Sequence, residues 1–369
     1  MKVIYFIDSL HRGGGTQKFL VDLASGLATR GFNQTVISLN DNPDPLFINQ
    51  LEQYDIHVRV IGKLPILTGL GILNNILWLK KEKFDTAVTL LFVSDIIGRF
   101  MAHMAYVPNI ISSLRARNIN YNFIQRWLVR QTARWIDKVV LNSAKMREFA
   151  ILEEGVPENK IHIIPNCVKV ENYSISINRA EFRSEMGFFP QDFVIGSVGR
   201  LHKQKGQDIL LKAIALLPQK DIHLLLIGEG EEIANLRHLS KKLGLEDRVH
   251  FSGYRCDVPR ILKILDLYVQ PSRYEGMPNS LMEAMSSACP IVASSVDGIS
   301  ELILDGVHGW LVTPEDIQSL AETIQRITQN PSEANRRAIA AQERVKKCFG
   351  VEVMVNAWEK VLFQTIMNY

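Results

Sequence analysis

Short apolar runs alternate with stretches of helical periodicity along the first half of the chain. Residues 3–7 form a run rich in β-branched side chains, which is typical of a strand buried in a parallel sheet. Similar runs predict strands over 35–39, 57–61, 86–91, 109–113, 138–141 and 161–164. Between the first two runs, Phe19, Leu20, Leu23, Ala24 and Leu27 recur at helical spacing. This order of strand and helix predicts a doubly wound parallel sheet with helices on both faces.

Four more helices are expected in this half, over residues 73–83, 95–105 and 122–135, and beginning near Ser143. We expect Ser94 to cap the second one, because a serine hydroxyl accepts a hydrogen bond from the first helical turn. The third helix carries Arg126, Arg130 and Arg134 at successive turns, with Trp127 and Trp135 beside them. This stripe fits an anionic membrane surface and equally fits a solvated helix face.

The alternation pauses over residues 168–177 and then restarts. Strands are predicted over 193–198, 223–227, 249–251, 267–269, 291–293 and 310–312, with helices over 207–217, 231–243 and 259–265. Thr313 is expected to cap a later helix, followed by a proline in its first turn. The pattern predicts two doubly wound domains, over 1–170 and 175–350, with a cleft between them. Ligands of such sheets bind outside the carboxyl ends of the strands.

The bulk composition narrows the class of protein. The chain has 369 residues, of which 47% are hydrophobic and 22% charged, so two globular domains can each bury a core. Its four cysteines form no C-x-x-C pair, which disfavours a disulfide framework or a zinc site. The apolar run at the N-terminus is too short for a signal peptide, and no run is long enough to span a bilayer. We therefore expect a cytoplasmic protein. The net charge of +3 argues neither for nor against nucleic acid, and no nucleic-acid partner is expected.

The most informative stretch is Ser272-Arg-Tyr-Glu-Gly-Met-Pro-Asn-Ser-Leu-Met-Glu283. Glu275 and Glu283 bracket a turn with glycine and proline that leads into an apolar helix near Ser280. A helix N-terminus binds anions, and carboxylates accept hydrogen bonds from sugar hydroxyls, so the stretch fits a nucleotide sugar. Glu275 is expected at the mouth of this site and Glu283 one helical turn inside. The same residues equally fit a capping box, in which Glu283 serves only its own helix.

Three other loops would also suit an anion. Residues 13–15 are a glycine triplet after the first strand, and 228–230 are Gly-Glu-Gly; each also fits an ordinary connection or turn. The third loop, after strand 193–198, carries Arg200 as a planar fork and Lys205 as a point charge for a diphosphate, whereas we interpret Lys203 as solvated. Neither G-x-G-x-x-G nor a Walker pattern is present, which disfavours hydride carriers and P-loop hydrolases.

Taken together, Gly199-Arg200 to Lys205-Gly206, then Glu275-Gly-Met-Pro and Glu283, resemble the retaining nucleotide-sugar glycosyltransferases of family four. The resemblance covers nearly the full chain and implies the GT-B fold, with a last helix over 351–369 returning to the first domain. It implies transfer of a hexosyl unit from a UDP- or GDP-linked sugar to a glycan or lipid-linked acceptor. A lipid-linked acceptor would place the enzyme peripherally at the inner face of a membrane.

The resemblance also implies roles for single residues. Arg200 and Lys205 would hold the diphosphate, Glu275 would accept hydrogen bonds from the donor sugar, and Glu283 would hold the ribose. The other implied substrate contacts are Gly14, Gly15, Tyr254, Gly276, Met277, Asn279, Ser280 and Leu281. Many relatives have a histidine roughly where Arg115 stands, so Arg115 is expected to replace it or to serve the acceptor.

The expected mechanism needs neither a metal nor a cofactor, since the nucleotide sugar is itself a substrate. The chain has no Asp-x-Asp pair, and positive side chains can meet the leaving-group charge instead. By resemblance, Glu275 orients the sugar for front-side attack and is not a nucleophile. A glycosidase is disfavoured, because Glu283 lies inside a helix and hydrolysis has no use for the basic loop. Another nucleotide-sugar enzyme, such as an epimerase, and a non-catalytic nucleotide-sugar-binding protein stay open.

Overall fold

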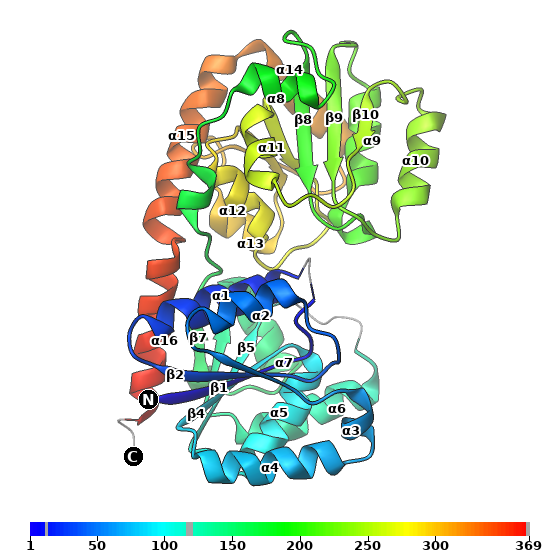
Figure 1. The fold of residues 1–369 in the computed structure, drawn as a ribbon. Helices are drawn as coiled ribbons and strands as arrows, with labels where there is room; N and C mark the ends of the chain where they lie inside the picture. Colours follow the sequence, from blue (N-terminus) through cyan, green and yellow to red (C-terminus); the bar gives the residue numbers. More distant parts are fainter. Residues whose placement is uncertain (12–13, 116–120, 367–369) are drawn as a thin grey trace. The chain divides into compact units, whose positions relative to one another are not determined.

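The chain folds into two compact units, each with its own parallel sheet and helices on both faces (Figure 1). The structure is a computed structural model and describes residues 1–11, 14–115 and 121–366. Unit 1 comprises Met1–Cys167 together with the chain from Val351 onward, and unit 2 comprises Val168–Gly350.

Unit 1 contains a seven-stranded sheet in the order β3-β2-β1-β4-β5-β6-β7. Its strands are β1 (Lys2–Ile7), β2 (Asn33–Ser38), β3 (His57–Val60), β4 (Thr86–Leu90), β5 (Asn109–Leu114), β6 (Lys138–Leu141) and β7 (Ile161–Ile163). Its α-helices are α1 (Gly15–Ala28), α2 (Pro45–Glu52), α3 (Lys63–Leu67), α4 (Leu70–Glu82), α5 (Phe92–Met104), α6 (Phe123–Thr132), α7 (Arg147–Leu152) and α16 (Val351–Ile366).

The two faces of this sheet are covered by different helices. One hydrophobic cluster joins the sheet to α1 and α16, and Trp358 of α16 is fully buried beside Phe19 of α1. A second cluster joins the other face to α4 and α5 through side chains such as Ile76 and Met101. The expected return of the last helix to the first domain is therefore confirmed.

Unit 2 contains a six-stranded sheet in the order β10-β9-β8-β11-β12-β13. Its strands are β8 (Phe193–Val198), β9 (Ile222–Ile227), β10 (Val249–Phe251), β11 (Leu267–Gln270), β12 (Ile291–Ser294) and β13 (Trp310–Val312). Its α-helices are α8 (Arg179–Glu185), α9 (Gln207–Ala215), α10 (Ile233–Lys242), α11 (Val258–Ile264), α12 (Asn279–Ser286), α13 (Asp297–Leu302), α14 (Ile317–Gln329) and α15 (Pro331–Cys348).

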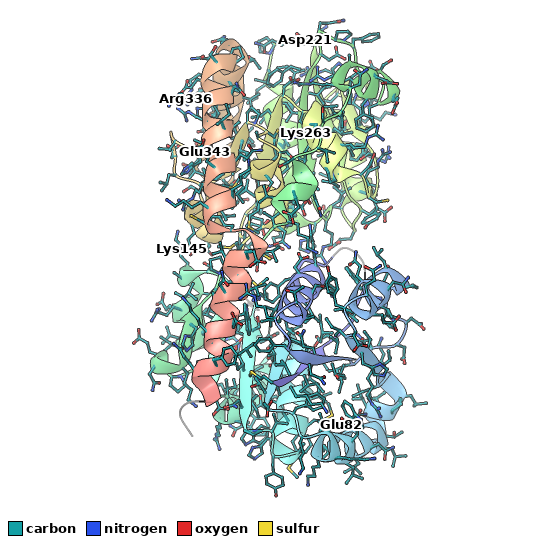
Figure 2. The ribbon with its side chains drawn as sticks, turned by 60° about the vertical axis from the view of Figure 1, so that its left-hand side comes forward. Glu82, Lys145, Asp221, Lys263, Arg336 and Glu343 are labelled. Atoms are coloured by element: carbon teal, nitrogen blue, oxygen red, sulfur yellow. The ribbon has the colours of Figure 1, made fainter. Side chains whose placement is uncertain are left out.

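The long helix α15 packs one side against unit 2 and leaves the other to solvent. Ala338, Ala341 and Val345 are fully buried. Arg336 and Glu343, labelled in Figure 2, are exposed on the same helix. This split follows the helical repeat, because residues three and seven apart share one face.

All strand pairs in both sheets are parallel. The direction in which successive strands are added reverses once in each sheet. After β3 the chain returns to the other side of β1, and after β10 it returns to the other side of β8. These reversals create the topological switch points at which ligands of doubly wound sheets bind. The predicted fold of two doubly wound sheets is confirmed.

Two predicted helix caps are wrong. Ser94 lies inside α5, which begins at Phe92, and the carboxylate of Asp8 accepts the backbone N–H groups of Val93 and Ser94 at 3.1 and 2.7 Å. Thr313 does not start α14, because Asp316 is the capping residue and accepts the N–H of Ser319. The contact at α5 comes from a residue 85 positions away, which no local motif reveals, whereas Asp316 caps α14 by an ordinary contact three residues along the chain.

The helix predicted over 122–135 is shorter than expected. Helix α6 ends at Thr132, and the chain continues as a 3₁₀ turn over Ala133–Trp135. Asn122 caps its start with a full capping box to Gln125. Thr132 also accepts a hydrogen bond from the buried Arg99 of α5, which fixes this end of the helix.

Candidate functional site

Two loops leave the sheet of unit 2 on either side of its switch point. One runs from Gly199 to Gly206 after β8, and the other runs from Pro271 to Pro278 after β11. Gly206 has φ +69°, and a Cβ there would lie 2.0 Å from the carbonyl oxygen of Pro271. Only glycine fits this position, so the two loops approach each other directly.

An ion pair joins the two loops. The Lys205 ammonium lies 2.6 Å from Oε1 of Glu275. The same oxygen accepts hydrogen bonds from Ser272 Oγ at 2.7 Å and from Gln270 Nε2 at 3.1 Å. The sequence had suggested that Glu275 lies at the mouth of the site. In the structure only 7% of this residue is exposed, and its carboxylate is held inside a polar network.

Tyr268 lies behind this network. Its hydroxyl donates to Gln270 Oε1 at 2.6 Å, and the ring is fully buried in β11. Burial first, and then the charges of Glu283 and Glu275, raise the pKa of Tyr268. The tyrosine therefore stays a neutral donor that orients Gln270 toward Glu275.

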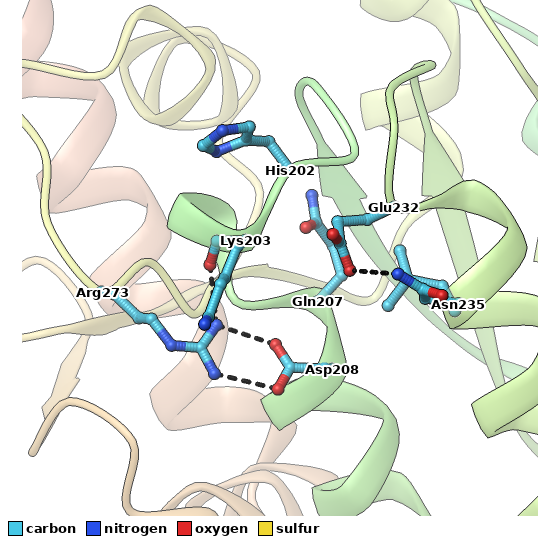
Figure 3. Close-up of a pocket in the computed structure, with 8 residues that line it drawn as sticks. His202, Lys203, Gln207, Asp208, Glu232, Asn235 and Arg273 are labelled. Atoms are coloured by element: carbon cyan, nitrogen blue, oxygen red, sulfur yellow. Dashed lines mark hydrogen bonds and ion pairs between the residues drawn. The ribbon is translucent and has the colours of Figure 1, made fainter.

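Arg273 fastens the basic loop from the outside (Figure 3). Its guanidinium forms a bidentate pair with Asp208 at 2.8 and 2.9 Å and donates to the carbonyl oxygen of Lys203 at 2.7 Å. The pair raises the pKa of Arg273, and it outweighs burial to lower the pKa of Asp208. These residues border a polar pocket of about 320 Å³ between the basic loop and α10.

Helix α12 begins at Asn279 with Pro278 as its capping position, and no side chain caps it. The capping-box alternative is therefore wrong: Ser280 lies inside the helix and its hydroxyl donates to Gln270 Oε1 at 3.2 Å. N–H groups in the first turn of a helix have no acceptor within it, and they include those of Ser280 and Leu281. This end of α12 points its positive dipole at the Glu275 loop.

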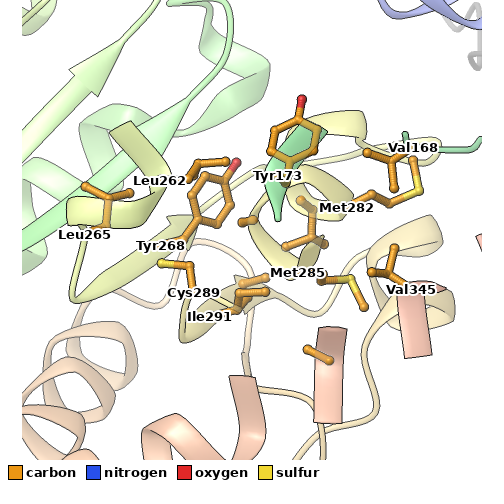
Figure 4. Close-up of a cluster of buried hydrophobic side chains, with 14 of the residues drawn as sticks. Val168, Tyr173, Leu262, Leu265, Tyr268, Met282, Met285, Cys289, Ile291 and Val345 are labelled. Carbon is orange, nitrogen blue, oxygen red and sulfur yellow. The ribbon is translucent and has the colours of Figure 1, made fainter. Parts of the chain in front are cut away.

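A hydrophobic cluster seats α12 rigidly under the site (Figure 4). Leu281, Met282 and Met285 are fully buried, and Met277 joins the same cluster with 5% exposed. Gly276 is packed from the other side, because a Cβ on Gly298 would lie 1.4 Å from its carbonyl oxygen. The Met277 side chain thus serves the core, and its backbone lies at the loop.

Arg200 and Tyr254 lie at the more open side of unit 2. Arg200 is exposed. The pKa of Glu231 is lowered first by a backbone hydrogen bond and then by the charges of His202 and Arg200. Tyr254 is 49% exposed, and its N–H points to Glu229 at 3.5 Å. Gly228 packs on the basic loop, since a Cβ there would lie 2.0 Å from the carbonyl oxygen of Gly199.

Three candidate site residues, Gly14, Gly15 and Arg115, belong to unit 1. Gly14 is the capping position of α1 and Gly15 its first residue, and no side chain caps this helix. Gly13 lies outside the described residues. A Cβ on Gly14 would lie 1.7 Å from Gln17 Oε1, so a larger residue would displace that side chain.

Arg115 is a buried cation at the end of β5. Its Nε donates to Ser113 at 2.8 Å, its Nη1 donates to Asn166 at 2.9 Å, and its guanidinium lies 3.4 Å from the centre of the Phe19 ring. Burial lowers the pKa of Arg115 to about 9. Its Nη2 is buried and has no hydrogen-bond partner among the described residues.

Sequence reasoning missed the residues that fix the site from behind. Tyr268 and Gln270 alternate on one face of β11, and a period of two in polar residues within a buried strand is the signal that could have found them. Arg273 carried no such signal, because its partners Asp208 and Glu315 are remote in sequence.

Comparison with known proteins settles the family. Residues 13–172 match the family model for "Glycosyltransferase Family 4", and residues 178–344 match that for "Glycosyl transferases group 1". The chain is a family-four glycosyltransferase. This glycosyltransferase has the GT-B fold, which its sequence resemblance had implied.

Three relatives illustrate the likeness. The glycosyltransferase is 29% identical over 264 residues, 68% of each chain, to the UDP-Gal:α-D-GlcNAc-diphosphoundecaprenol α-1,3-galactosyltransferase of Escherichia coli. It is 26% identical to the lipopolysaccharide core biosynthesis glycosyltransferase LpsE of Rhizobium meliloti, covering 98% of this chain and 99% of LpsE. The crystal structure of Anabaena Alr3699/HepE in complex with UDP superposes with a TM-score of 0.88 and 25% identity over 99% of this chain and all of that one.

Within the described ranges, no helix combines the length and apolar character needed to cross a membrane. No three His, Cys, Asp or Glu side chains of those ranges converge in an arrangement that could hold a metal ion.

Proposed function

We propose that this glycosyltransferase moves a hexosyl unit from a UDP-sugar to a lipid-linked or glycan acceptor, with retention and without a metal ion. The Lys205–Glu275 pair at the switch point of unit 2 carries the proposal. A preorganised cation there can meet the charge that develops on a departing diphosphate. The UDP complex of Alr3699/HepE and the lipid-linked acceptor in the name of the Escherichia coli relative support the choice of substrates.

Positive and negative side chains of the site have different roles. Lys205 and Arg200 hold the diphosphate, with the first turn of α12 supplying N–H donors, while Glu283 accepts hydrogen bonds from the ribose. Glu275 orients the sugar. In the transfer, an acceptor hydroxyl oxygen bonds to the anomeric carbon as the bond to the diphosphate breaks, and the hydroxyl proton passes to the departing phosphate.

Arg115 in unit 1 is proposed to serve the acceptor or the transferred sugar. Its cation is fixed by Ser113, Asn166 and Phe19, which leaves Nη2 as the guanidinium nitrogen without a partner among the described residues. Such a rigid buried donor suits an oxygen ligand.

Thermal-shift measurements with UDP-, GDP- and ADP-sugars test the choice of donor. A UDP-sugar at 100 times its dissociation constant should stabilise the protein by about 2.7 kcal/mol and raise its Tm. GDP- and ADP-sugars should have little effect. A shift with GDP-sugars alone would contradict the choice of uridine as the nucleoside of the donor. Formation of free sugar or of an epimerised donor, without transfer to an acceptor, would contradict the proposed transferase reaction.

A further inference from the structure

An exposed row of leucines crosses the outer side of α3 and α4 in unit 1. Their exposed fractions run from 60% to 83%. The row, called here the leucine strip, consists of Leu64, Leu67, Leu70, Leu73 and Leu77. On α4, Leu70, Leu73 and Leu77 are spaced by three and four residues and therefore share one face. Single exposed leucines are ordinary on a protein surface, but a row of this length needs an explanation.

The strip does not serve the core of unit 1. Helix α4 buries its opposite side, where Ile76 and Leu79 join the cluster that covers the sheet. The helix is therefore apolar on both its buried and its exposed sides. A surface helix ordinarily turns a polar side to water, so the outer leucines are expected to meet another apolar medium.

The charged residues within the segment 63–83 that carries the strip are almost all positive, and Asp41 approaches only its first end, where it accepts the N–H of Lys63 at 3.1 Å. Lys63 precedes it and Lys80 and Lys81 end it, and all three are exposed. Glu82 is the one acid between residues 63 and 83, and Lys2 neutralises it at 2.6 Å. Figure 2 labels Glu82 on this part of unit 1. An apolar row with a basic border is complementary to a bilayer that carries anionic headgroups.

We propose that the leucine strip and its lysines dock unit 1 on an anionic lipid bilayer. The leucines enter the boundary between headgroups and acyl chains, while the lysines extend their ammonium groups to lipid phosphates. A second copy of the chain fits less well, because a twofold contact would pair two copies of one basic surface, and residues 63–83 offer only one acid to balance it. The inference rests on the proposed function, in which the acceptor is lipid-linked.

In the arginine stripe of α6, two of the three side chains have partners within unit 1, while Arg134 is exposed. Arg126 pairs with Glu153 at 2.8 Å, and Arg130 donates to the carbonyl oxygen of Glu153 at 3.0 Å. These arginines fasten α6 to the end of α7 within their own unit. Two of these guanidinium groups are thus held by α7, whereas the five leucines of the strip are exposed.

Flotation of the full chain with vesicles tests the proposal. The wild type should float with phosphatidylglycerol-containing vesicles and much less with pure phosphatidylcholine. The double variant Leu73→Glu, Leu77→Glu should lose at least about tenfold in partitioning, because each change removes a leucine from the lipid and adds a negative charge. A matched control is Leu216→Glu in unit 2, where an isolated leucine is 54% exposed, and it should float as the wild type does.

A second pair of variants tests the lysines. Lys80→Glu with Lys81→Glu should also lose at least about tenfold on anionic vesicles. Lys241→Glu with Lys242→Glu is the control, because these lysines likewise end a helix, α10 in unit 2, and it should bind normally. Each substituted side chain is exposed, and an unchanged Tm shows that the variants fold.

Three results would overturn the docking surface. They are no flotation of the wild type, equal flotation of the strip variant, and a strip-dependent dimer in sedimentation velocity without vesicle binding. Flotation requires no turnover, so the two proposals fail separately. Vesicle binding without sugar transfer would contradict the proposed function, and transfer without vesicle binding would contradict the docking surface.

Discussion

Glu154 is a carboxyl group that the interior of unit 1 keeps from solvent. It is 3% exposed, and its Oε2 has no hydrogen-bond partner among the described residues. Burial raises the pKa of Glu154 to about 7, against the opposing charge of Arg99 and with a further contribution from Asp95. The folded protein therefore holds a proton here that the unfolded chain, with an ordinary pKa of 4.5, has already lost near neutral pH.

The stability of the wild type should fall as the pH rises from about 5 to about 7, because the folded state must then ionise a buried acid. Glu154→Gln removes this penalty. We expect the variant to exceed the wild type by on the order of 1 kcal/mol or more above pH 7, and the gap to close toward pH 5. Chemical denaturation at both pH values measures it.

Glu153→Gln is the control, because that neighbour is exposed and pairs with Arg126. An exposed pair contributes about 0–1 kcal/mol, so this variant should change stability little at either pH. A Glu154→Gln variant that is less stable than the wild type at every pH would contradict the description of Glu154 as a buried, protonated acid.

Arg273 links three elements of unit 2 at the scale of loops and helices. It connects the loop after β11 to α9 through Asp208 and to the turn that carries Lys205 through the carbonyl of Lys203. Arg273→Ala should therefore release the basic loop and lower kcat by up to about 100-fold, since small displacements of catalytic groups have effects of this size. Steady-state kinetics would show it as a loss in kcat.

Arg273→Lys should rescue little, because lysine cannot form the bidentate pair. The control is Arg179→Ala, which removes a pair with Asp266 at 2.6 Å before β11, at the other end of that strand. It should leave kcat unchanged. If Arg273→Ala and Arg179→Ala had the same kcat, Arg273 would have no positioning role.

The elements themselves were largely predictable, since buried parallel strands are continuous apolar runs such as 193–198, found in the structure as β8. Some helix starts were predictable, such as Gln207 of α9, but that of α5 was not. Asp8 caps α5 from 85 residues away, and no local motif reports such a partner. In the site, the glycines and charged residues of the two loops were visible in the sequence. The burial of Glu275 was not, because it depends on Gln270 and Ser272 meeting it across the turn.

At the scale of the whole molecule, the chain crosses between its units twice, after Cys167 and again at Val351. The second crossing delivers α16 to unit 1, where Trp358 fills the core beside Phe19. Trp358→Ala should destabilise unit 1 by about 3–5 kcal/mol. Val353→Ala, on the same helix but 42% exposed, should stay within about 0.5 kcal/mol of the wild type.

Hydrogen exchange measured at increasing denaturant concentration reports the stability of each unit separately. We expect the Trp358→Ala variant to lose protection in unit 1 while unit 2 keeps it. Equal loss in both units, or none, would contradict the assignment of α16 to the core of unit 1.

The central claim is that Lys205, rather than a metal ion, meets the charge of the departing UDP. The direct test is UDP release from UDP-hexoses with a lipid-linked acceptor, measured with a chelator present for the wild type, Lys205→Ala and Lys203→Ala. Lys203 is the matched control because it lies in the same loop and is exposed. We predict that the wild type and Lys203→Ala stay active with the chelator, while Lys205→Ala loses about 100- to 1000-fold in kcat. Loss of wild-type activity on chelation, together with an unchanged kcat for Lys205→Ala, would contradict it.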